Sequence, residues 1–322
     1  MRVFVTGATG FIGGHVARLL RERGDDVAAL VRTPEKGEPL RELGCDLVEG
    51  DLSHEEAIKG GVEGCDAVIH VGAVYKVGIP KSEHEAMWDA NVRGTERVLD
   101  AAHDAGAKRI VYVSTCNVFG NTHGELVDES YRRDESEGFL SYYDETKYRA
   151  HEAAEERIGK GYPVVIVQPA GVYGPNDHSE IGNMIDQART GKLKLKMFPD
   201  TGFMLIHVED VAKGILLALD KGEVGESYIL AGEQTRMGDL VDRVAEKSGR
   251  KPPRGTMPAG LIKASAPLGP AVGPLLGFPP NLRELIRVSD GVTYWATDEK
   301  ARRELGFEPR DLDAGLEDTL SG

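Results

Sequence analysis

Tyr143 and Lys147 are the pair of residues with the clearest chemical meaning in this sequence. On a helix, side chains four residues apart lie on one face. A free phenol has a pKa of about 10 and is a weak acid–base group at neutral pH, but a nearby cation lowers that pKa. Tyr143 would then exchange a proton with a carbinol oxygen. Tyr142 has only the uncharged Thr146 at the same spacing. Many such tyrosine–lysine pairs are ordinary surface pairs, so the surrounding sequence must show whether this pair is catalytic.

A glycine-rich loop near the start of the chain provides that context. The apolar stretch 3–6 is followed by three glycines and then by helical spacing over 13–23. Glycines in such a strand–turn–helix unit permit the turn, let the backbone approach a pyrophosphate and let the helix pack on the strand. The helix N-terminus adds N–H groups and a positive dipole. A merely structural turn is the alternative. We expect a dinucleotide to contact Gly7, Thr9, Gly10, Phe11, Ile12 and Gly13.

The end of the second predicted strand, 27–31, indicates which dinucleotide binds. An acidic residue there would bind the ribose 2′-hydroxyl of NAD, but the strand is followed by Arg32. An arginine forms charge-assisted hydrogen bonds with a 2′-phosphate. We therefore expect NADP, with NAD as the possible alternative and a solvated arginine as the other interpretation. The ends of later strands are expected to add cofactor contacts at Asp51, Leu52, Val71, Gly72 and Ala73.

Hydroxyl side chains follow the apolar stretch 110–113, at Ser114 and Thr115. Parallel sheets bind their ligands at the carboxyl ends of the strands. Thr115 is therefore expected to donate a hydrogen bond to the substrate oxygen, and Ser114 to face the nicotinamide. The alternative is that both residues only form a turn.

Short apolar stretches alternate with helical ones through the first half of the chain. Buried strands of this kind form a parallel sheet covered on both faces, and right-handed crossovers make it a doubly wound α/β (Rossmann) sheet. We expect 1–167 to form this domain, with a returning segment near 205–232. Residues 168–204 and 233–322 are expected to form a smaller, mixed α/β substrate domain. Its proline- and glycine-rich part, 251–280, is either an adaptable wall over the substrate or an irregular cap.

The charge of the chain excludes several classes of partner. It has 39 Lys and Arg against 53 Asp and Glu in 322 residues, a net charge of −14. Nucleic acids and anionic membranes repel such a chain. The apolar runs are shorter than the roughly 20 residues of a membrane span. The three cysteines have no metal-ligand spacing and the first residues show no secretion signal, so we expect a cytoplasmic protein without a metal, nucleic-acid or membrane partner.

Together these motifs resemble those of the extended short-chain dehydrogenase/reductases, within the NAD-dependent epimerase/dehydratase superfamily. The resemblance covers nearly the whole chain. It rests on 6–13, 91–95, 113–120, 143–147, 169–175, 207–212 and 305–307. By resemblance, the catalytic set is Thr115, Tyr143 and Lys147, and Lys147 also binds the nicotinamide ribose.

The resemblance further implies that Pro169 and Val172 border the nicotinamide. It also implies a homodimer built from the helices around 83–105 and 143–158.

Two changes separate this chain from the nucleotide-sugar branch of the family. Those enzymes usually carry Arg-x-x-Asn where this chain has Gln168 and Gly171, and an arginine where it has Phe203. A sugar diphosphate needs cationic or amide partners. We therefore expect a less charged substrate, in contact with Tyr75, Asn117 and Phe203. Packing at the domain junction is the alternative for Phe203.

The leading hypothesis is an NADP-dependent reductase of an aldehyde or ketone, like the dihydroflavonol reductases that 202–207 resembles. Thr115 would orient the carbonyl oxygen, Tyr143 would protonate it and Lys147 would tune Tyr143. One alternative is a nucleotide-sugar epimerase or dehydratase that holds NAD(P) tightly. Another is a non-catalytic, dinucleotide-dependent sensor. His151 either extends a proton relay or is an ordinary surface histidine.

Overall fold

The computed structural model describes residues 1–265 and 281–321. The proline- and glycine-rich segment 251–280 is therefore described only to residue 265. The expected wall or cap formed by its second part, 266–280, lies outside the described residues.

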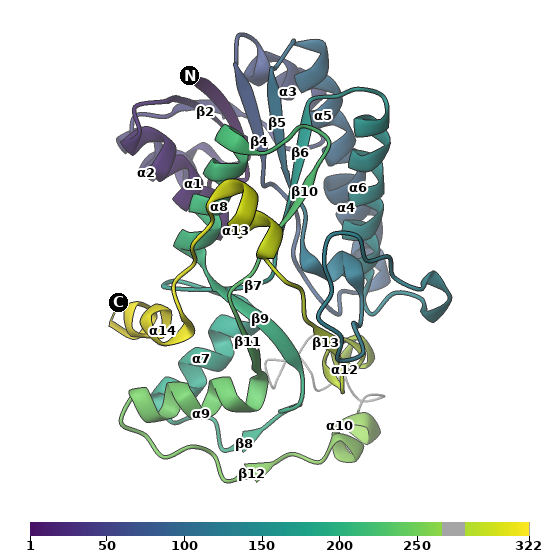
Figure 1. The fold of residues 1–322 in the computed structure, drawn as a ribbon, viewed down its shortest axis with the longest axis vertical. Helices are drawn as coiled ribbons and strands as arrows, with labels where there is room; N and C mark the ends of the chain where they lie inside the picture. Colours follow the sequence, from purple (N-terminus) through teal and green to yellow (C-terminus); the bar gives the residue numbers. More distant parts are fainter. Residues whose placement is uncertain (266–280, 322) are drawn as a thin grey trace.

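Seven strands form one continuous sheet, which occupies the upper part of Figure 1. They are β1 (Arg2–Thr6), β2 (Asp26–Val31), β3 (Asp46–Glu49), β4 (Ala67–His70), β5 (Arg109–Val113), β6 (Val164–Pro169) and β10 (Ser227–Leu230). Their order is β10-β6-β5-β4-β1-β2-β3, and every neighbouring pair is parallel. This confirms the predicted doubly wound α/β sheet. The order reverses at β1 and β4, and such a reversal places the ligand crevice there.

Helices cover both faces of this sheet, because each has an apolar stripe that must be buried. Those that share one core with the sheet are α1 (Phe11–Glu22), α2 (Glu38–Glu42), α8 (Val208–Lys221) and α13 (Glu299–Leu305). Those that share the other core are α3 (Glu55–Val62), α5 (Gly94–Asp104) and α6 (Tyr142–Gly159). Short 3₁₀ turns complete this part at Pro34–Gly37, Lys81–Glu83, Cys116–Phe119 and Glu135–Glu137.

The predicted continuous helix around 83–105 is interrupted in the structure. It consists of α4 (His84–Trp88), a π-helical turn (Asp89–Arg93) and α5. Within the π-turn, Asn91 Oδ1 accepts from Val74 N at 2.7 Å, and Asn91 Nδ2 donates to Val74 O at 3.0 Å. The wider turn directs Asn91 at the loop after β4, which helical periodicity alone does not reveal. Such π-bulges often occur at functional sites.

A second, smaller sheet lies below the first in Figure 1. Its strands are β7 (Gly171–Tyr173), β9 (Gly202–His207), β11 (Glu233–Arg236) and β13 (Thr293–Tyr294). β9 pairs in parallel with β7 and β13 and antiparallel with β11, so this sheet is mixed. The helices packed with it are α7 (Glu180–Thr190), α9 (Met237–Lys247) and α14 (Leu312–Ser321).

The remaining elements are β8 (Leu195–Lys196), β12 (Gly255–Thr256), α10 (Ala259–Ser265) and α12 (Leu282–Ser289). Of these, β8 and β12 lie below α9 in Figure 1, and α10 and α12 lie at the lower right. β8 and β12 pair in parallel, and α10 and α12 share a small apolar core with Phe198. After the second sheet begins at β7, the chain returns to the large sheet through α8 and β10.

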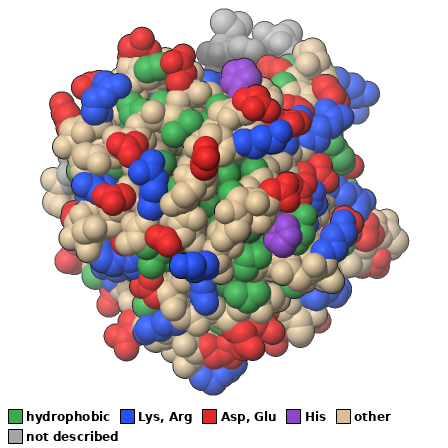
Figure 2. Space-filling model, turned by 90° about the horizontal axis from the view of Figure 1, so that it is seen from above, with side chains coloured by type: hydrophobic (Ala, Val, Ile, Leu, Met, Phe, Trp, Pro, Cys, Tyr) green, Lys and Arg blue, Asp and Glu red, His purple; other side chains and the backbone are tan. Residues whose placement is uncertain are grey.

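Charged side chains of both signs are interspersed on the face shown in Figure 2. Basic groups on this face stand next to acidic ones rather than forming one broad positive area. In the part of the chain that the structure describes, no helix is both long and apolar enough to cross a membrane.

Replacement of Gly13 by alanine tests the close packing of α1 on the glycine loop. A Cβ on Gly13 would overlap the carbonyl oxygen of Gly7, whereas one on Gly14 would lie 3.5 Å from Ala8 O, an ordinary contact. We expect Gly13→Ala to lower the free energy of unfolding by about 3 kcal/mol, as overpacking does. Gly14→Ala should leave it unchanged or raise it by up to ~1 kcal/mol. Urea unfolding of both variants measures the difference, and equal effects would contradict the assigned packing.

Candidate active site

The glycine loop between β1 and α1 has the shape of a phosphate-binding site. A Cβ on Gly7 would lie 2.7 Å from Gly72 N, and Gly7 has a φ of +74°, which favours glycine. Gly10 precedes α1 as its N-cap, and no side chain caps the helix. The N–H groups of the first turn are thus left for an anion. These residues fit the pyrophosphate of a dinucleotide.

Arg32 and Asp51 lie at the carboxyl ends of β2 and β3, where the adenosine half of a dinucleotide would extend from the loop. Burial raises the pKa of Asp51, but hydrogen bonds from Ser53 and the charges of His54 and Arg32 outweigh that effect and lower it. Arg32 is exposed. The expected contact of its guanidinium with a 2′-phosphate stays a prediction.

The other predicted cofactor residues lie in loops, in the first turn of α1 and in two strands. Val71, Gly72 and Ala73 directly follow β4. Leu52 packs beside Gly72, where an added Cβ would lie 3.4 Å from the Leu52 side chain. The remaining ones lie in the loop before α1, in its first turn, at the end of β6 and in β7: Thr9, Phe11, Ile12, Pro169 and Val172.

A buried chain of polar groups connects the glycine loop with α6. Thr6 Oγ1 lies 2.7 Å from His70 Nδ1, and His70 Nε2 lies 3.0 Å from Thr95 Oγ1. Thr95 donates to Asn91 O at 2.7 Å, and Asn91 Nδ2 donates to Thr146 Oγ1 at 2.9 Å. Elements far apart in the sequence are thereby held in one arrangement.

The hydrogen bonds assign the proton positions within this chain. Gly72 N donates to Thr6 Oγ1 at 3.1 Å, which leaves the Thr6 proton for His70 Nδ1. His70 then carries its own proton on Nε2 and donates to Thr95. Burial and the charge of Lys147 lower the pKa of His70 to about 3. His70 is therefore neutral and positions its neighbours. The sequence analysis assigned no such role to His70, although the motif 91–95 contains other members of this row of buried polar groups.

The tyrosine–lysine pair lies on the first turns of α6. Ser141 caps this helix by accepting from Asp144 N at 3.0 Å. The Tyr143 and Lys147 side chains are both buried, with exposed fractions of 8% and 4%. Lys147 Nζ donates to Val113 O at 3.0 Å and approaches the Tyr112 hydroxyl at 3.3 Å. The lysine is thus anchored to β5.

The pKa of Tyr143 differs from the expectation that Lys147 lowers it. Burial raises this pKa, and the neighbouring Tyr112, Asp144 and Glu180 add to the rise. Burial also lowers the pKa of Lys147 to about 7. A low-dielectric site disfavours charge on both groups, so the phenol keeps its proton while the ammonium loses it more readily.

Thr115 begins the 3₁₀ turn after β5, and that turn packs against α6. Its hydroxyl accepts from Asn117 N at 3.2 Å and lies 3.4 Å from Asn117 Oδ1. The neighbouring Ser114 faces α6 instead, because its hydroxyl lies 2.9 Å from His151 Nδ1. The roles of these residues toward cofactor or substrate stay predictions.

Tyr75, one of the expected substrate contacts, packs against Tyr143. The two rings meet edge to face with centroids 4.8 Å apart, and the Tyr75 hydroxyl donates to Glu180 Oε2 at 2.8 Å. Tyr75 and Glu180 line an open cavity of about 380 Å³ together with Glu83. Phe203 lies elsewhere: it packs with the core of the second sheet and stacks on Tyr294 at 5.7 Å.

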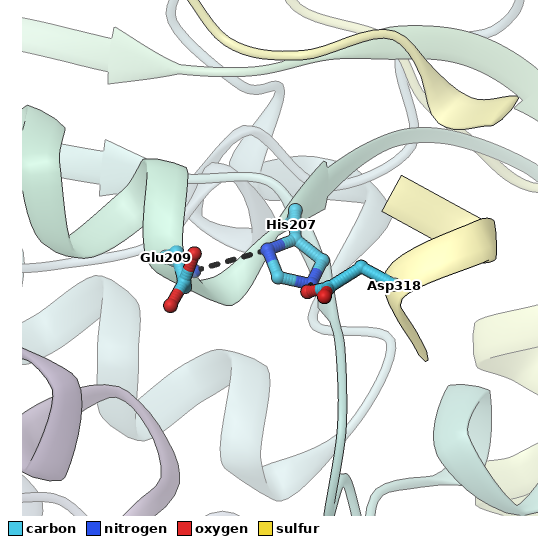
Figure 3. A group of neighbouring side chains, drawn as sticks. All are labelled: His207, Glu209 and Asp318. Atoms are coloured by element: carbon cyan, nitrogen blue, oxygen red, sulfur yellow. Dashed lines mark hydrogen bonds and ion pairs between the residues drawn. The ribbon is translucent and has the colours of Figure 1, made fainter. Parts of the chain in front are cut away.

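Three potential metal ligands, His207, Glu209 and Asp318, lie close together on β9, α8 and α14 (Figure 3). His207 Nδ1 accepts from Glu209 N at 3.3 Å, and its Nε2 lies 3.2 Å from Asp318 Oδ2. Arg310 bridges both carboxylates, at 3.0 Å from Glu209 and 3.5 Å from Asp318, and Arg18 lies 3.0 Å from Glu209. Two arginines thus already neutralise these carboxylates, and the group is an ion-pair network that ties α14 to the centre of the molecule.

The chain belongs to the NAD-dependent epimerase/dehydratase family, whose sequence profile matches residues 3–231. With its glycine loop and tyrosine–lysine pair, the protein is an NAD(P)-dependent oxidoreductase of the extended short-chain dehydrogenase/reductase type, as the sequence predicts.

Relatives with reductase names cover nearly the whole chain. It is 34% identical over 318 residues to 4-hydroxy-2-methyl-3-oxo-4-farnesyl-3,4-dihydroquinoline-1-oxide ketoreductase of Stigmatella aurantiaca, spanning 96% of this chain and 92% of that protein. It is 32% identical to a Synechocystis sp. protein provisionally named dihydroflavonol 4-reductase, spanning 98% and 93%.

Among solved structures, the crystal structure of gox2253 superimposes with a TM-score of 0.85 and 34% identity over 99% of this chain and 96% of that one. MoeE5 in complex with UDP-glucose and NAD has a TM-score of 0.79 over 100% and 98%. At 23% identity, MoeE5 shows the shared fold alone.

Removal of the Lys147 charge should stabilise the protein at low pH. Lys147 has a pKa of about 7 in the folded protein and about 10.4 in the unfolded chain. At pH values between these two, the unfolded chain binds more protons than the folded protein does. In that window this lysine makes stability rise with pH, by at most about 1.4 kcal/mol per pH unit. Below pH 7 the cost of burying the charge is fully present. We expect Lys147→Met to raise the melting temperature at pH 6, with the gain shrinking toward pH 10.

The exposed Lys160, at the end of the same helix, provides the control. Lys160→Met should show no such pH-dependent gain when both melting temperatures are followed by circular dichroism. A gain for Lys147→Met that is the same at pH 6 and pH 10 would contradict the assigned burial of charge.

Proposed function

We propose that this protein is an NADP-dependent reductase of an uncharged ketone or aldehyde. The observation that carries the proposal is the Tyr143 phenol. It is buried, its pKa is raised by burial, and no residue in the described part of the chain forms a hydrogen bond with it. A phenol that keeps its proton at neutral pH and has a free hydroxyl is prepared to protonate a carbonyl oxygen.

When bound, NADPH supplies a hydride for the carbonyl carbon. The glycine loop and the N-terminus of α1 hold the pyrophosphate, and Lys147 holds the nicotinamide ribose. Thr115 turns its hydroxyl from Asn117 to the substrate oxygen and orients it. Tyr143 transfers its proton to that oxygen as negative charge develops there. The ammonium of Lys147 favours the resulting phenolate.

The mouth of the cavity supports an uncharged substrate. Carboxylates of Glu83 and Glu180 line it, and Lys76, which also lines it, lies 3.5 Å from Glu83. Such a mouth repels the diphosphate of a nucleotide sugar. Phe203 stands where the family resemblance implies an arginine in sugar-nucleotide enzymes, and it stacks on Tyr294. The ketoreductase and dihydroflavonol reductase names of the two relatives agree with this class of substrate.

Two broader features complete the proposal. The protein is proposed to form a homodimer through the helices around 83–105 and 143–158. It is proposed to act in the reducing cytoplasm, in agreement with the three buried, free cysteines, Cys45, Cys65 and Cys116.

Replacement of Tyr143 by phenylalanine tests the reductase chemistry. The wild-type protein should oxidise NADPH with members of a carbonyl panel that includes ethyl acetoacetate and acetophenone. Tyr143→Phe removes the proton donor and should lower kcat about 100- to 10,000-fold, the usual contribution of an acid–base group, while NADPH binding persists. Absorbance at the nicotinamide band and fluorescence titration measure the two quantities.

The adjacent Tyr142, which stacks on His84, is the matched control, and Tyr142→Phe should stay active. Full activity of Tyr143→Phe would refute the assignment. The runner-up, a nucleotide-sugar epimerase or dehydratase, predicts instead conversion of UDP-sugars without net NADPH loss and release of bound cofactor on denaturation.

Replacement of Arg32 by serine tests the preference for NADP. The loss of charge-assisted hydrogen bonds to the 2′-phosphate should weaken NADPH binding about 10- to 100-fold. NADH lacks this phosphate, so its affinity should stay unchanged and serves as the internal control. Equal weakening of both cofactors, measured by calorimetry, would show that Arg32 does not select NADP.

A further inference from the structure

The phenol of Tyr143 is positioned by packing rather than by hydrogen bonds. Within the described residues its hydroxyl has no hydrogen-bond partner. Its ring packs in a small apolar cluster with Ile79 and Val74, and it meets the ring of Tyr75 edge to face. The place of the hydroxyl therefore depends on two segments. One is the first turn of α6, which carries Tyr143, and the other is the loop after β4, residues 71–80.

One carboxylate, that of Glu284 on α12, holds both of these segments. Its Oε2 accepts a hydrogen bond from Gly78 N at 2.5 Å, and its Oε1 accepts one from Tyr142 N. Tyr142 is the first residue of α6, so its N–H has no carbonyl partner within the helix. Gly78 directly precedes Ile79, which packs on Tyr143. Glu284 thus connects the backbone on either side of the phenol.

The N-terminus of α6 is a favourable place for this carboxylate. Hydrogen bonds from N–H groups to a carboxylate are roughly twice as strong as those between neutral groups, and the helix dipole favours negative charge there. The other caps of this helix are local: Ser141 accepts from Asp144 N at 3.0 Å, and Asp144 accepts from Leu140 N at 2.9 Å. Glu284 instead comes from a segment 142 residues further along the chain than Tyr142.

α12 contacts the two parts of the molecule that must meet around a substrate. On one side Arg287 donates a hydrogen bond to Phe139 O, in the segment that leads into α6. On the other side Leu282 and Ile286 pack with Phe198, which lies within the predicted substrate domain. The helix therefore bridges that domain and the first turn of α6.

We propose that Glu284 is a positioning residue of the active site, whose carboxylate sets the Tyr143 phenol against the substrate oxygen by fixing Gly78 and the first turn of α6. This inference rests on the proposed reductase function. Glu284 does not touch the substrate or transfer a proton. A misplacement of about 1 Å in an active site can cost about 100-fold in rate, so the two anchors should affect kcat. Binding of NADPH at the glycine loop should not depend on them.

The first experiment compares Glu284→Gln with Asp290→Asn. Glutamine keeps the shape of the side chain, but its NH₂ group faces one of the two N–H groups. Asp290 directly follows α12 and pairs with Lys263 of α10 at 2.5 Å, so its replacement loosens α12 without removing a bond to α6. With NADPH and the panel compound that the wild type reduces, Glu284→Gln should lower kcat about tenfold and leave the KM for NADPH unchanged. Asp290→Asn should keep the wild-type kcat.

A double variant separates positioning from a general loss of structure. If Glu284 acts through the phenol, it has nothing to position once the hydroxyl is removed. Tyr143→Phe combined with Glu284→Gln should therefore have the same residual rate as Tyr143→Phe alone in single-turnover reactions. A combined loss equal to the product of the two separate losses would overturn the proposal, as would a wild-type kcat in Glu284→Gln. Both results leave the reductase assignment intact, because that assignment depends on Tyr143→Phe.

Amide hydrogen exchange tests the two anchors without turnover. In the cofactor-free wild type, the N–H groups of Gly78 and Tyr142 should be protected. Glu284→Ala should speed the exchange of both about 10- to 100-fold, as expected for the loss of a hydrogen bond to a charged group, whereas Asp290→Asn should not. NMR of ¹⁵N-labelled protein measures both rates. If Glu284→Ala does not fold, Glu284→Gln should show the faster exchange at one of the two positions.

Two outcomes of the exchange measurement are decisive. Fast exchange of both N–H groups in the wild type would overturn the positioning role of Glu284. Protection that depends on Glu284, in a protein that reduces no carbonyl compound, would count against the proposed function but not against the two anchors.

Discussion

The buried polar chain from Thr6 to Thr146 is the constraint on which the rest of the site depends. Unpaired polar groups in a sheet-covered interior are costly, so each member must find its partner. Here a histidine kept neutral by burial satisfies threonines on both sides, and Asn91 connects the loop after β4 with α6. The glycine loop and α6 are therefore fixed relative to one another before any ligand binds, and catalysis depends on preorganisation of this kind.

Burial shifts the pKa values of Tyr143 and Lys147, the proposed catalytic pair, in opposite directions. Burial raises the pKa of Tyr143, so the phenol keeps its proton, and it lowers the pKa of Lys147, so the ammonium loses its proton more readily. A tyrosine beside an always-charged lysine would favour phenolate from the start, which suits oxidation of an alcohol. The pair in this interior instead begins as a phenol next to a readily deprotonated ammonium, and these protonation states suit reduction.

Much of the architecture follows from local pattern. Apolar stretches and glycine spacing predict β1, the loop and α1, and the alternation of strands and helices predicts the doubly wound sheet. The Tyr143–Lys147 spacing predicts a shared helical face. The interruption at Asp89–Arg93 is missed, since a π-turn depends on the contact of Asn91 with Val74 rather than on helical periodicity. The pKa of Tyr143 is missed because spacing does not reveal burial.

The sequence by itself determined which groups are present and which lie close along the chain: the glycine loop, the pair on α6, the hydroxyls after β5 and the absence of an acid after β2. Local geometry has a fixed period, so such neighbours can be read from spacing. Only the tertiary structure decided that Ser114 meets His151, that Lys147 meets β5 and that Tyr75 covers Tyr143 beside Glu180. These contacts depend on strand order and on the depth at which each side chain is buried, and both arise from packing of distant segments.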